Sequence, residues 1–138
     1  MGSAEENIVK EFMDAWGDGR QKDPDIEKIV SMFSNDAVWQ LWIPGGPTLR
    51  GRDDIRTDIE RQLRFATFMQ CGAVHIASNG DVVFTERVDH FTSNGETVEH
   101  HLVAVFEVDA DGKIAAWREY FDPEDVNRQL RAAAKASP

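Results

Sequence analysis

The 138-residue sequence has few of the features that identify particular classes of protein: it has one cysteine, five prolines and no apolar run of membrane-spanning length. A lone Cys71 cannot form an internal disulfide, and no Cys/His spacing resembles a zinc site, so we expect no metal and no disulfide. Residues 1–16 mix Glu, Asp and Lys with apolar residues, which is not the pattern of a signal peptide. These absences favour a soluble cytoplasmic protein that uses no cofactor.

Positive charge and tyrosine are also scarce. Lys and Arg number 15 against 25 Asp and Glu, which gives a net charge of −10. A surface this acidic argues against nucleic acid and against an anionic membrane as partners. Eight Phe and four Trp stand against one Tyr, so the aromatic content is almost wholly apolar. Such residues suit a core, or the wall of a pocket for a small apolar substrate or ligand.

The order of expected elements predicts an α+β fold in a single domain over residues 1–138. The length and the hydrophobic content of 41% suit one core better than two. Helical and strand periodicities, with turn signals between them, mark the elements. Helices are expected at 3–16, 24–33, about 52–68 and from 123 onward, and strands at 35–43 and near 72–78, 82–92, 96–108 and 113–121. Helices would then cover one side of a curved, largely antiparallel sheet.

Two of the expected strands place charges among apolar residues. In "FTERVDHF", alternation puts Arg87 and Asp89 on one face. In "IAAWREYFD", Glu119 shares a face with Trp117 and Phe121, which is an unusual setting for a solvated carboxylate. One interpretation is a reactive site, and the other is a structural ion pair with Arg87, because buried ion-pair networks also perturb carboxylates.

The strand "VEHHLVAVFEV" is apolar on both faces. His100 and Leu102 share the face that is expected to look inward, and Val103 and Val105 share the other. A strand covered on both sides needs a second cover besides the helices, and a second copy of the chain is the simplest source. The pattern therefore predicts a homodimer. For His100, a hydrogen-bonded core histidine and a pocket residue both remain open.

With the segments "FSNDAVWQLWIP", "TERVD" and "WREYFD", the chain resembles the limonene-1,2-epoxide hydrolase family, within the nuclear transport factor 2-like, ketosteroid isomerase-like (SnoaL-like) superfamily. The resemblance implies a cone-shaped, curved, mixed or antiparallel sheet packed with three helices around a deep apolar pocket. It also implies dimerisation through the outer face of the sheet, in agreement with the two-faced strand.

The same resemblance implies one-step addition of water to a small apolar epoxide. By position, Arg87 bridges two carboxyl groups, Asp89 is the general acid, and Glu119 is the general base where the family usually has Asp. Trp39 and Leu41 replace the Tyr and Asn that steady the attacking water in the family, so the water site is altered. The residues expected to contact the substrate are Trp39, Leu41, Phe91, His100, Leu102 and Phe121.

Asp122 is a second candidate for the base, but it faces the opposite side of its strand from Glu119 and precedes Pro123. Both facts favour a helix N-cap for this residue.

Two other functions remain open from the sequence. A ketosteroid isomerase-like or polyketide cyclase-like enzyme could use Glu119, Asp89 or His100 to move protons without a lytic water. A non-catalytic binder of a small hydrophobic ligand could keep the charged residues as structural ion pairs.

Overall fold

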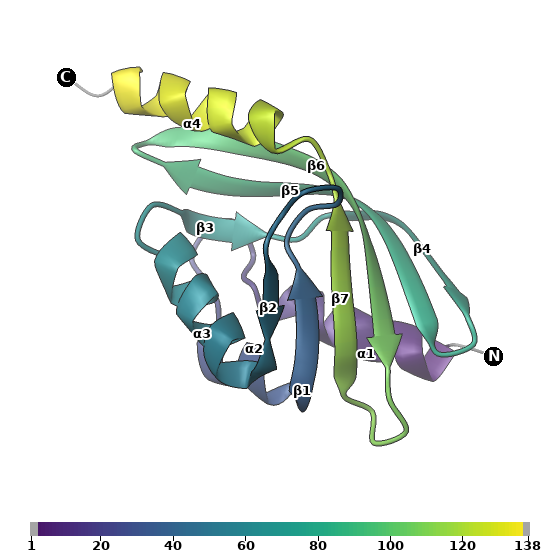
Figure 1. Cartoon of the computed structure of the whole chain (residues 1–138). Helices are drawn as coiled ribbons and strands as arrows, with labels where there is room; N and C mark the ends of the chain where they lie inside the picture. Colours follow the sequence, from purple (N-terminus) through teal and green to yellow (C-terminus); the bar gives the residue numbers. More distant parts are fainter. Residues whose placement is uncertain (1–2, 137–138) are drawn as a thin grey trace.

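In the part of the chain that the structure describes, seven strands form one curled, unclosed sheet that wraps around the interior, with helices packed on its inner side and across its ends (Figure 1). The computed structural model of the chain describes residues 3–136. In chain order the elements are α1 (Ser3–Asp14), α2 (Ile26–Ser31), β1 (Phe33–Gln40), β2 (Thr48–Arg50), α3 (Gly51–Gln62), β3 (Thr67–Gln70), β4 (Ala73–Asn79), β5 (Val82–Ser93), β6 (Glu96–Val108), β7 (Ile114–Tyr120) and α4 (Pro123–Ala136).

The strand order in the sheet is β2-β1-β7-β6-β5-β3, with β4 also pairing with β5. Among the described strands, β1 and β7 are the one pair that runs parallel, so the sheet is mixed but mainly antiparallel, as expected. Its longest pairing is the β5–β6 hairpin, whose turn has Asn94 and Gly95 at positive φ, the arrangement that the "TSNGE" segment predicts.

β5 changes its partner midway along its length. The part up to Arg87 pairs with β4, and the part from His90 pairs with β3. Gly72 lies between those two short strands, where the Val88 N–H donates to its carbonyl at 2.9 Å and its own N–H lies 3.2 Å from Asp89 Oδ1. A Cβ at position 72 would lie 2.4 Å from the Val88 carbonyl oxygen, so only glycine permits this close approach.

The closed end of the fold is a packed aromatic cluster. The α1 residue Phe12 is fully buried and makes edge-to-face contacts with Phe33, Phe106 and Trp117, at centroid distances of 5.1–5.6 Å. Edge-to-face pairs of this kind add stabilisation to the burial of their apolar area. This cluster, here called the closed end, anchors α1 against β6 and β7.

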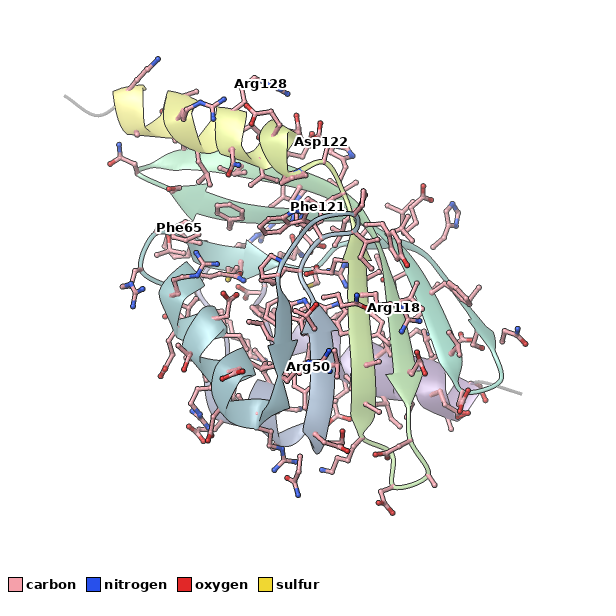
Figure 2. All side chains as sticks on the ribbon, viewed as in Figure 1. Arg50, Phe65, Arg118, Phe121, Asp122 and Arg128 are labelled. Atoms are coloured by element: carbon pink, nitrogen blue, oxygen red, sulfur yellow. The ribbon has the colours of Figure 1, made fainter. Side chains whose placement is uncertain are left out.

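The C-terminal helix α4 covers the opposite, open end. Figure 2 shows Phe121 and Asp122 where the chain passes from β7 into α4. Asp122 Oδ1 accepts from the Glu124 N–H at 3.0 Å, which confirms its role as a helix cap. Farther along, the side-chain amide of Gln129 exchanges hydrogen bonds with the backbone of Glu99 on β6, which holds α4 across the sheet.

Several predicted boundaries were wrong. The third helix ends at Gln62 and not at Phe68, because Thr67–Gln70 pairs with β5 instead, with Phe68 at a φ of 52°. The second helix begins after Asp25, whose carboxylate accepts from the Lys28 N–H at 3.1 Å, so the cap lies two residues beyond Asp23.

The first strand begins at Phe33, and the short strand β2 was not predicted. The described residues contain the four helices that the sequence pattern predicts, where the resemblance implies three, and α3 and α4 contribute to the wall of the pocket. No helix within residues 3–136 is long and apolar enough to span a bilayer.

Candidate active site

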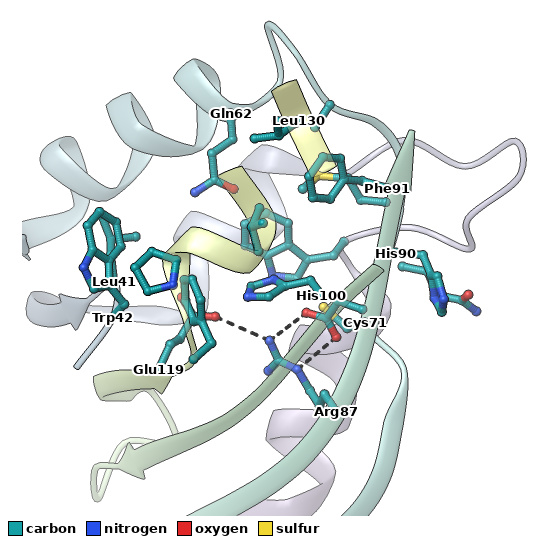
Figure 3. Close-up of a pocket in the computed structure, with 18 of the residues that line it drawn as sticks. Leu41, Trp42, Gln62, Cys71, Arg87, His90, Phe91, His100, Glu119 and Leu130 are labelled. Carbon is teal, nitrogen blue, oxygen red and sulfur yellow. Dashed lines mark hydrogen bonds and ion pairs between the residues drawn. The ribbon is translucent and has the colours of Figure 1, made fainter. Parts of the chain in front are cut away.

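A cavity of about 280 Å³ opens between the sheet and the helices α3 and α4 (Figure 3). Its walls are largely aromatic and aliphatic, and its floor carries charged groups from β5 and β7. Five of the six residues predicted to contact a substrate line this cavity: Trp39, Leu41, Phe91, His100 and Phe121.

Leu102 does not line the cavity, and this corrects the sixth expectation. Strand parity places it on the inner face, as predicted, but the register pairs it with Arg87, one step closer to the closed end than His100. There it is 5% exposed and belongs to the main hydrophobic core.

Arg87 forms the centre of the cavity floor. Its side chain is 1% exposed, and its Nε and Nη2 lie 3.1 and 2.9 Å from the two carboxylate oxygens of Asp89. Its Nη2 also lies 3.6 Å from Glu119 Oε2. One guanidinium therefore joins both carboxyl groups, as strand parity predicted, and Figure 3 shows the two ion pairs side by side.

The two carboxyl groups are held differently. Asp89 accepts two N–H groups from Arg87 in a bidentate pair, and its Oδ1 accepts a third from the backbone of Gly72. Hydrogen bonds donated to a carboxylate favour its ionised form. Asp89 is thus surrounded by donors that match a negative charge.

Glu119 has a less polar setting. Its residue is 6% exposed, and Oε1 accepts one hydrogen bond, from Trp39 Nε1 at 2.8 Å. Burial raises the pKa of Glu119 to about 8, although Arg87 and Trp39 act in the opposite direction. At neutral pH, Glu119 is therefore mainly protonated.

Trp39 explains part of the altered water site. Its indole stacks on Trp117 at 4.2 Å with an interplanar angle of 6°, and this orients its N–H toward Glu119. An indole has one donor and no acceptor, and Leu41 has neither on its side chain. Trp39 therefore positions a carboxyl group, at the place where the family resemblance implies a water-binding Tyr in other members.

His100 lies on β6 directly opposite Asp89 in the β5–β6 register, and Figure 3 shows its ring beside the cavity floor. Its ring packs against Phe121 edge-to-face, with centroids 4.3 Å apart. Burial lowers the pKa of His100 to about 4, so the imidazole is neutral at pH 7. Its Nε2 is buried and has no hydrogen-bond partner within residues 3–136, which does not fit a hydrogen-bonded core histidine.

Three further buried nitrogens in residues 3–136 also lack partners, and all belong to cavity-lining residues: Trp16 Nε1, Arg87 Nη1 and Trp117 Nε1. Buried polar groups in native proteins are usually hydrogen-bonded, so unpaired ones gathered in one cavity indicate a place for a bound molecule. No group of His, Cys, Asp and Glu in residues 3–136 is arranged to hold a metal ion.

The sequence interpretation missed the helical side of the cavity. Gln62 from α3, together with Val126, Asn127 and Leu130 from α4, forms part of the wall. The spacing of Val126 and Leu130 gives α4 an apolar stripe, but it does not say which surface that stripe covers. Cys71 also lines the cavity beside Asp89, and burial raises the pKa of its thiol above the ordinary value, so the thiol is neutral.

Comparisons with known proteins identify the family of this chain. The model of the SnoaL-like domain family matches residues 9–117, and the chain belongs to that family. It is 42% identical over 106 residues to the epoxide hydrolase EphG of Mycobacterium tuberculosis, which covers 77% of this chain and 68% of that protein.

Solved structures extend the likeness to nearly the whole chain. The structure of an M. tuberculosis LEH-like epoxide hydrolase superposes with a TM-score of 0.78 at 26% identity, covering 97% of this chain and 94% of that one. The epoxide hydrolase/cyclase-like enzyme SalBIII, described in pyran ring formation in the polyether salinomycin, shares the fold, with a TM-score of 0.75 at 22% identity over 88% and 92% of the two chains. The family resemblance and the fold class are therefore confirmed, and the chain is an enzyme.

Proposed function

We propose that the protein is an epoxide hydrolase of the limonene-1,2-epoxide hydrolase type. It adds water to a small apolar epoxide in one step and needs no cofactor. The observation that carries the proposal is the buried Arg87 with carboxyl groups on both sides, Asp89 at 2.9 Å and Glu119 at 3.6 Å, at the floor of an apolar cavity. The epoxide hydrolase relatives support the choice of reaction.

The chemistry of epoxide opening needs an acid and a base at the same time. One carboxyl group takes a proton from water as its oxygen attacks a ring carbon, while the other gives a proton to the oxygen of the breaking C–O bond. Two carboxyl groups in different settings across one Arg supply both states near neutral pH. Each proton transfer contributes roughly 10²–10⁴-fold to the rate.

The wall of the cavity selects the substrate. Leu41, Trp42, Phe91 and Phe121 present apolar surface around the charged floor, so a compact hydrocarbon skeleton fits better than a polar or charged one. A cyclic terpene epoxide resembling limonene oxide is a suitable first substrate.

Diol formation tests the function. Purified protein is incubated with limonene-like and smaller cyclic epoxides, and the diol is measured by chromatography against Glu119→Gln, Asp89→Asn and a heat-inactivated control. We expect diol from the wild type and only background rates from both variants. Equal rates in all samples would reject the assignment.

A cyclase is the second candidate, favoured by Trp39 and Leu41 in place of the family's water-holding pair. If no water is held for attack, a hydroxyl of the substrate itself could open the epoxide with the same acid and base. An epoxide carrying an internal hydroxyl distinguishes the two reactions, because a cyclase yields the cyclic ether and a hydrolase the triol. A binding protein would yield neither.

We also propose that the protein forms a homodimer through the outer face of the sheet. Phe84, Val103 and Tyr120 on β5, β6 and β7 are large apolar or aromatic residues that remain 40–42% exposed. Val103 and Tyr120 are direct cross-strand partners, and Val103 also pairs with Glu86, two residues beyond Phe84. A patch of this kind on neighbouring strands is typical of an interface.

A further inference from the structure

The departures from the family pattern concern the same small volume around Arg87. Glu119 stands where the family usually has Asp, Trp39 binds that carboxyl group, and Leu41 offers no polar atom on its side chain. An attacking water placed beside Glu119 would therefore have no second partner from the side chains of Trp39 and Leu41. The geometry on the other side of Arg87 is different.

Asp89 is the carboxyl group that accepts the larger number of hydrogen bonds. Both of its oxygens accept from the Arg87 guanidinium, and Oδ1 also accepts from Gly72 N–H. A proton on Asp89 would compete with these donors for its lone pairs, so Asp89 is a poor store for the proton that an acid must deliver. As a carboxylate, it can accept a proton from water.

Glu119 has the opposite character. Within residues 3–136, Trp39 supplies the one N–H that donates to its side chain. Trp117 on β7 and Phe121, directly after β7, are its apolar neighbours two positions away on either side, and both line the cavity. Such an apolar setting favours the neutral carboxyl group, which can then donate its proton.

His100 supplies the missing partner for a water on the Asp89 side. It is the cross-strand neighbour of Asp89, it lines the cavity, and its buried Nε2 has no partner among residues 3–136. A neutral imidazole can donate to the oxygen of a water whose hydrogen points to a carboxylate.

We propose that in this enzyme the two carboxyl groups have exchanged the roles that the family resemblance implies: His100 and Asp89 hold the attacking water, Asp89 is the general base, and Glu119 is the general acid. This assignment rests on the proposed epoxide hydrolase function and specifies which group performs each half of it.

The step balances without any further reactant. The water oxygen forms a bond to one ring carbon as Asp89 takes one of its protons. The bond between that carbon and the ring oxygen breaks, its electron pair stays on the oxygen, and Glu119 gives the oxygen a proton. The product is the diol, and one proton must pass from Asp89 back to Glu119 before the next turnover.

Rescue by azide distinguishes the two assignments. Azide attacks an epoxide without losing a proton, so it replaces water and base together but still needs the acid. Diol formation by the wild type is established first. Asp89→Asn and Glu119→Gln are then assayed with sodium azide between about pH 5 and 8, and the azido alcohol is measured by chromatography. The lower pH keeps Glu119 protonated when Asp89 no longer balances the charge of Arg87.

We expect azide to restore turnover to Asp89→Asn and not to Glu119→Gln. Rescue of Glu119→Gln, or of neither variant, would overturn the exchanged roles while leaving the hydrolase function in place. Absence of diol with the wild type would instead overturn the proposed function and this assignment with it. Circular dichroism of both variants is the control that checks that they are folded.

His100 is tested by a matched pair of substitutions. His100→Leu removes the hydrogen-bonding nitrogen. We expect kcat for hydrolysis to fall about a hundredfold, because a displacement of the attacking water by about 1 Å can slow the reaction by roughly that factor. His100→Gln retains a donor and should recover much of the rate. His75→Gln, at an exposed histidine on β4, is the control and should not change kcat. Full activity in His100→Leu would contradict the water site.

Discussion

The two ends of the interior are built on the same strands but in opposite ways. At the closed end, Phe12, Phe33 and Phe106 are fully buried and fill the space between α1 and the sheet. At the open end, β5 and β7 carry Arg87 and Glu119, which are also buried but lie in a cavity. The closed end stabilises the fold through the packing of apolar side chains. At the open end, polar side chains are removed from bulk water.

The buried polar groups around the cavity lower the stability of the folded protein. Each buried polar group without a partner costs about 1–3 kcal/mol, and four such nitrogens lie on cavity-lining residues of the described chain. The aromatic packing of the closed end offsets that loss. Trp117 belongs to both ends, since it contacts Phe12 on one side and stacks on Trp39 on the other. We expect a change at the closed end to act mainly on stability and a change at the open end to act mainly on activity, with Trp117 as the residue that connects the two.

The largest effect is expected at the open end. Glu119→Gln should lower kcat/KM by roughly 10²–10⁴-fold, because an amide can neither give nor take the proton. Near pH 6.5 its stability should stay close to that of the wild type, since Gln replaces a carboxyl group that is already neutral. Chemical denaturation and the diol assay measure the two quantities. Retained turnover with a large loss of stability would instead indicate a purely structural Glu119.

The opposite change is expected at the closed end. Phe12→Ala should lower the free energy of unfolding by about 3–5 kcal/mol, because it leaves a cavity among fully buried rings. Activity per folded molecule should be retained. Phe68→Ala, at a residue that is 43% exposed, is the matched control and should change stability by less than about 0.5 kcal/mol. If Phe12→Ala reduced kcat without reducing stability, the separation of the two ends would be wrong.

The pH dependence of stability separates the ends further. The pKa of Glu119 is about 8 in the folded protein against an ordinary value of 4.5, so between these values the folded state binds more protons than the unfolded state. Stability from this group therefore falls as pH rises, and the fall ends above pH 8. His100 acts in the opposite sense, but only between about pH 4 and 6.5.

Between pH 6.5 and 8, the wild type should thus lose about 2 kcal/mol relative to Glu119→Gln. Urea denaturation of both proteins at several pH values measures the difference. Parallel curves for the two proteins would show that Glu119 is already ionised below this range.

The smallest effect on activity is expected on the outer face of the sheet. Val103→Glu places a charge in the exposed apolar patch, so it should convert a dimer to a monomer while the cavity on the inner face keeps its activity. Light scattering at micromolar concentration measures the mass of both proteins. A wild type that is already monomeric would reject the dimer.

The period of two along a strand predicted which charged residues share a face, and the family resemblance implied that they form the floor of a pocket. Alternation placed Arg87 and Asp89 on one face of their strand and Glu119 on the face of Trp117 and Phe121, and the structure brings Arg87 within 2.9 Å of Asp89 and 3.6 Å of Glu119. It also excluded Asp122, which caps α4 as expected. These inferences succeeded because they depend only on local geometry.

What depended on contacts distant in sequence was not predicted. The end of α3 and the strand β3 follow from pairing with β5, which propensity alone does not reveal. Parity put Leu102 and His100 on one face but could not say that the cavity ends between them. The Nε2 of His100 has no hydrogen-bond partner within residues 3–136. This depends on which side chains from distant parts of the sequence lie near it, and no local sequence pattern specifies that.

The protonation of Glu119 is the most direct test of the contrast between its setting and that of Asp89. Protein labelled with ¹³C at the carboxyl groups of Glu is titrated by NMR, and the Glu119 signal is assigned by its absence in Glu119→Gln. We expect this signal to titrate with a midpoint near pH 8, so that Glu119 carries a proton at neutral pH. A midpoint near 4.5, the ordinary value of a Glu side chain, would contradict this account of the site.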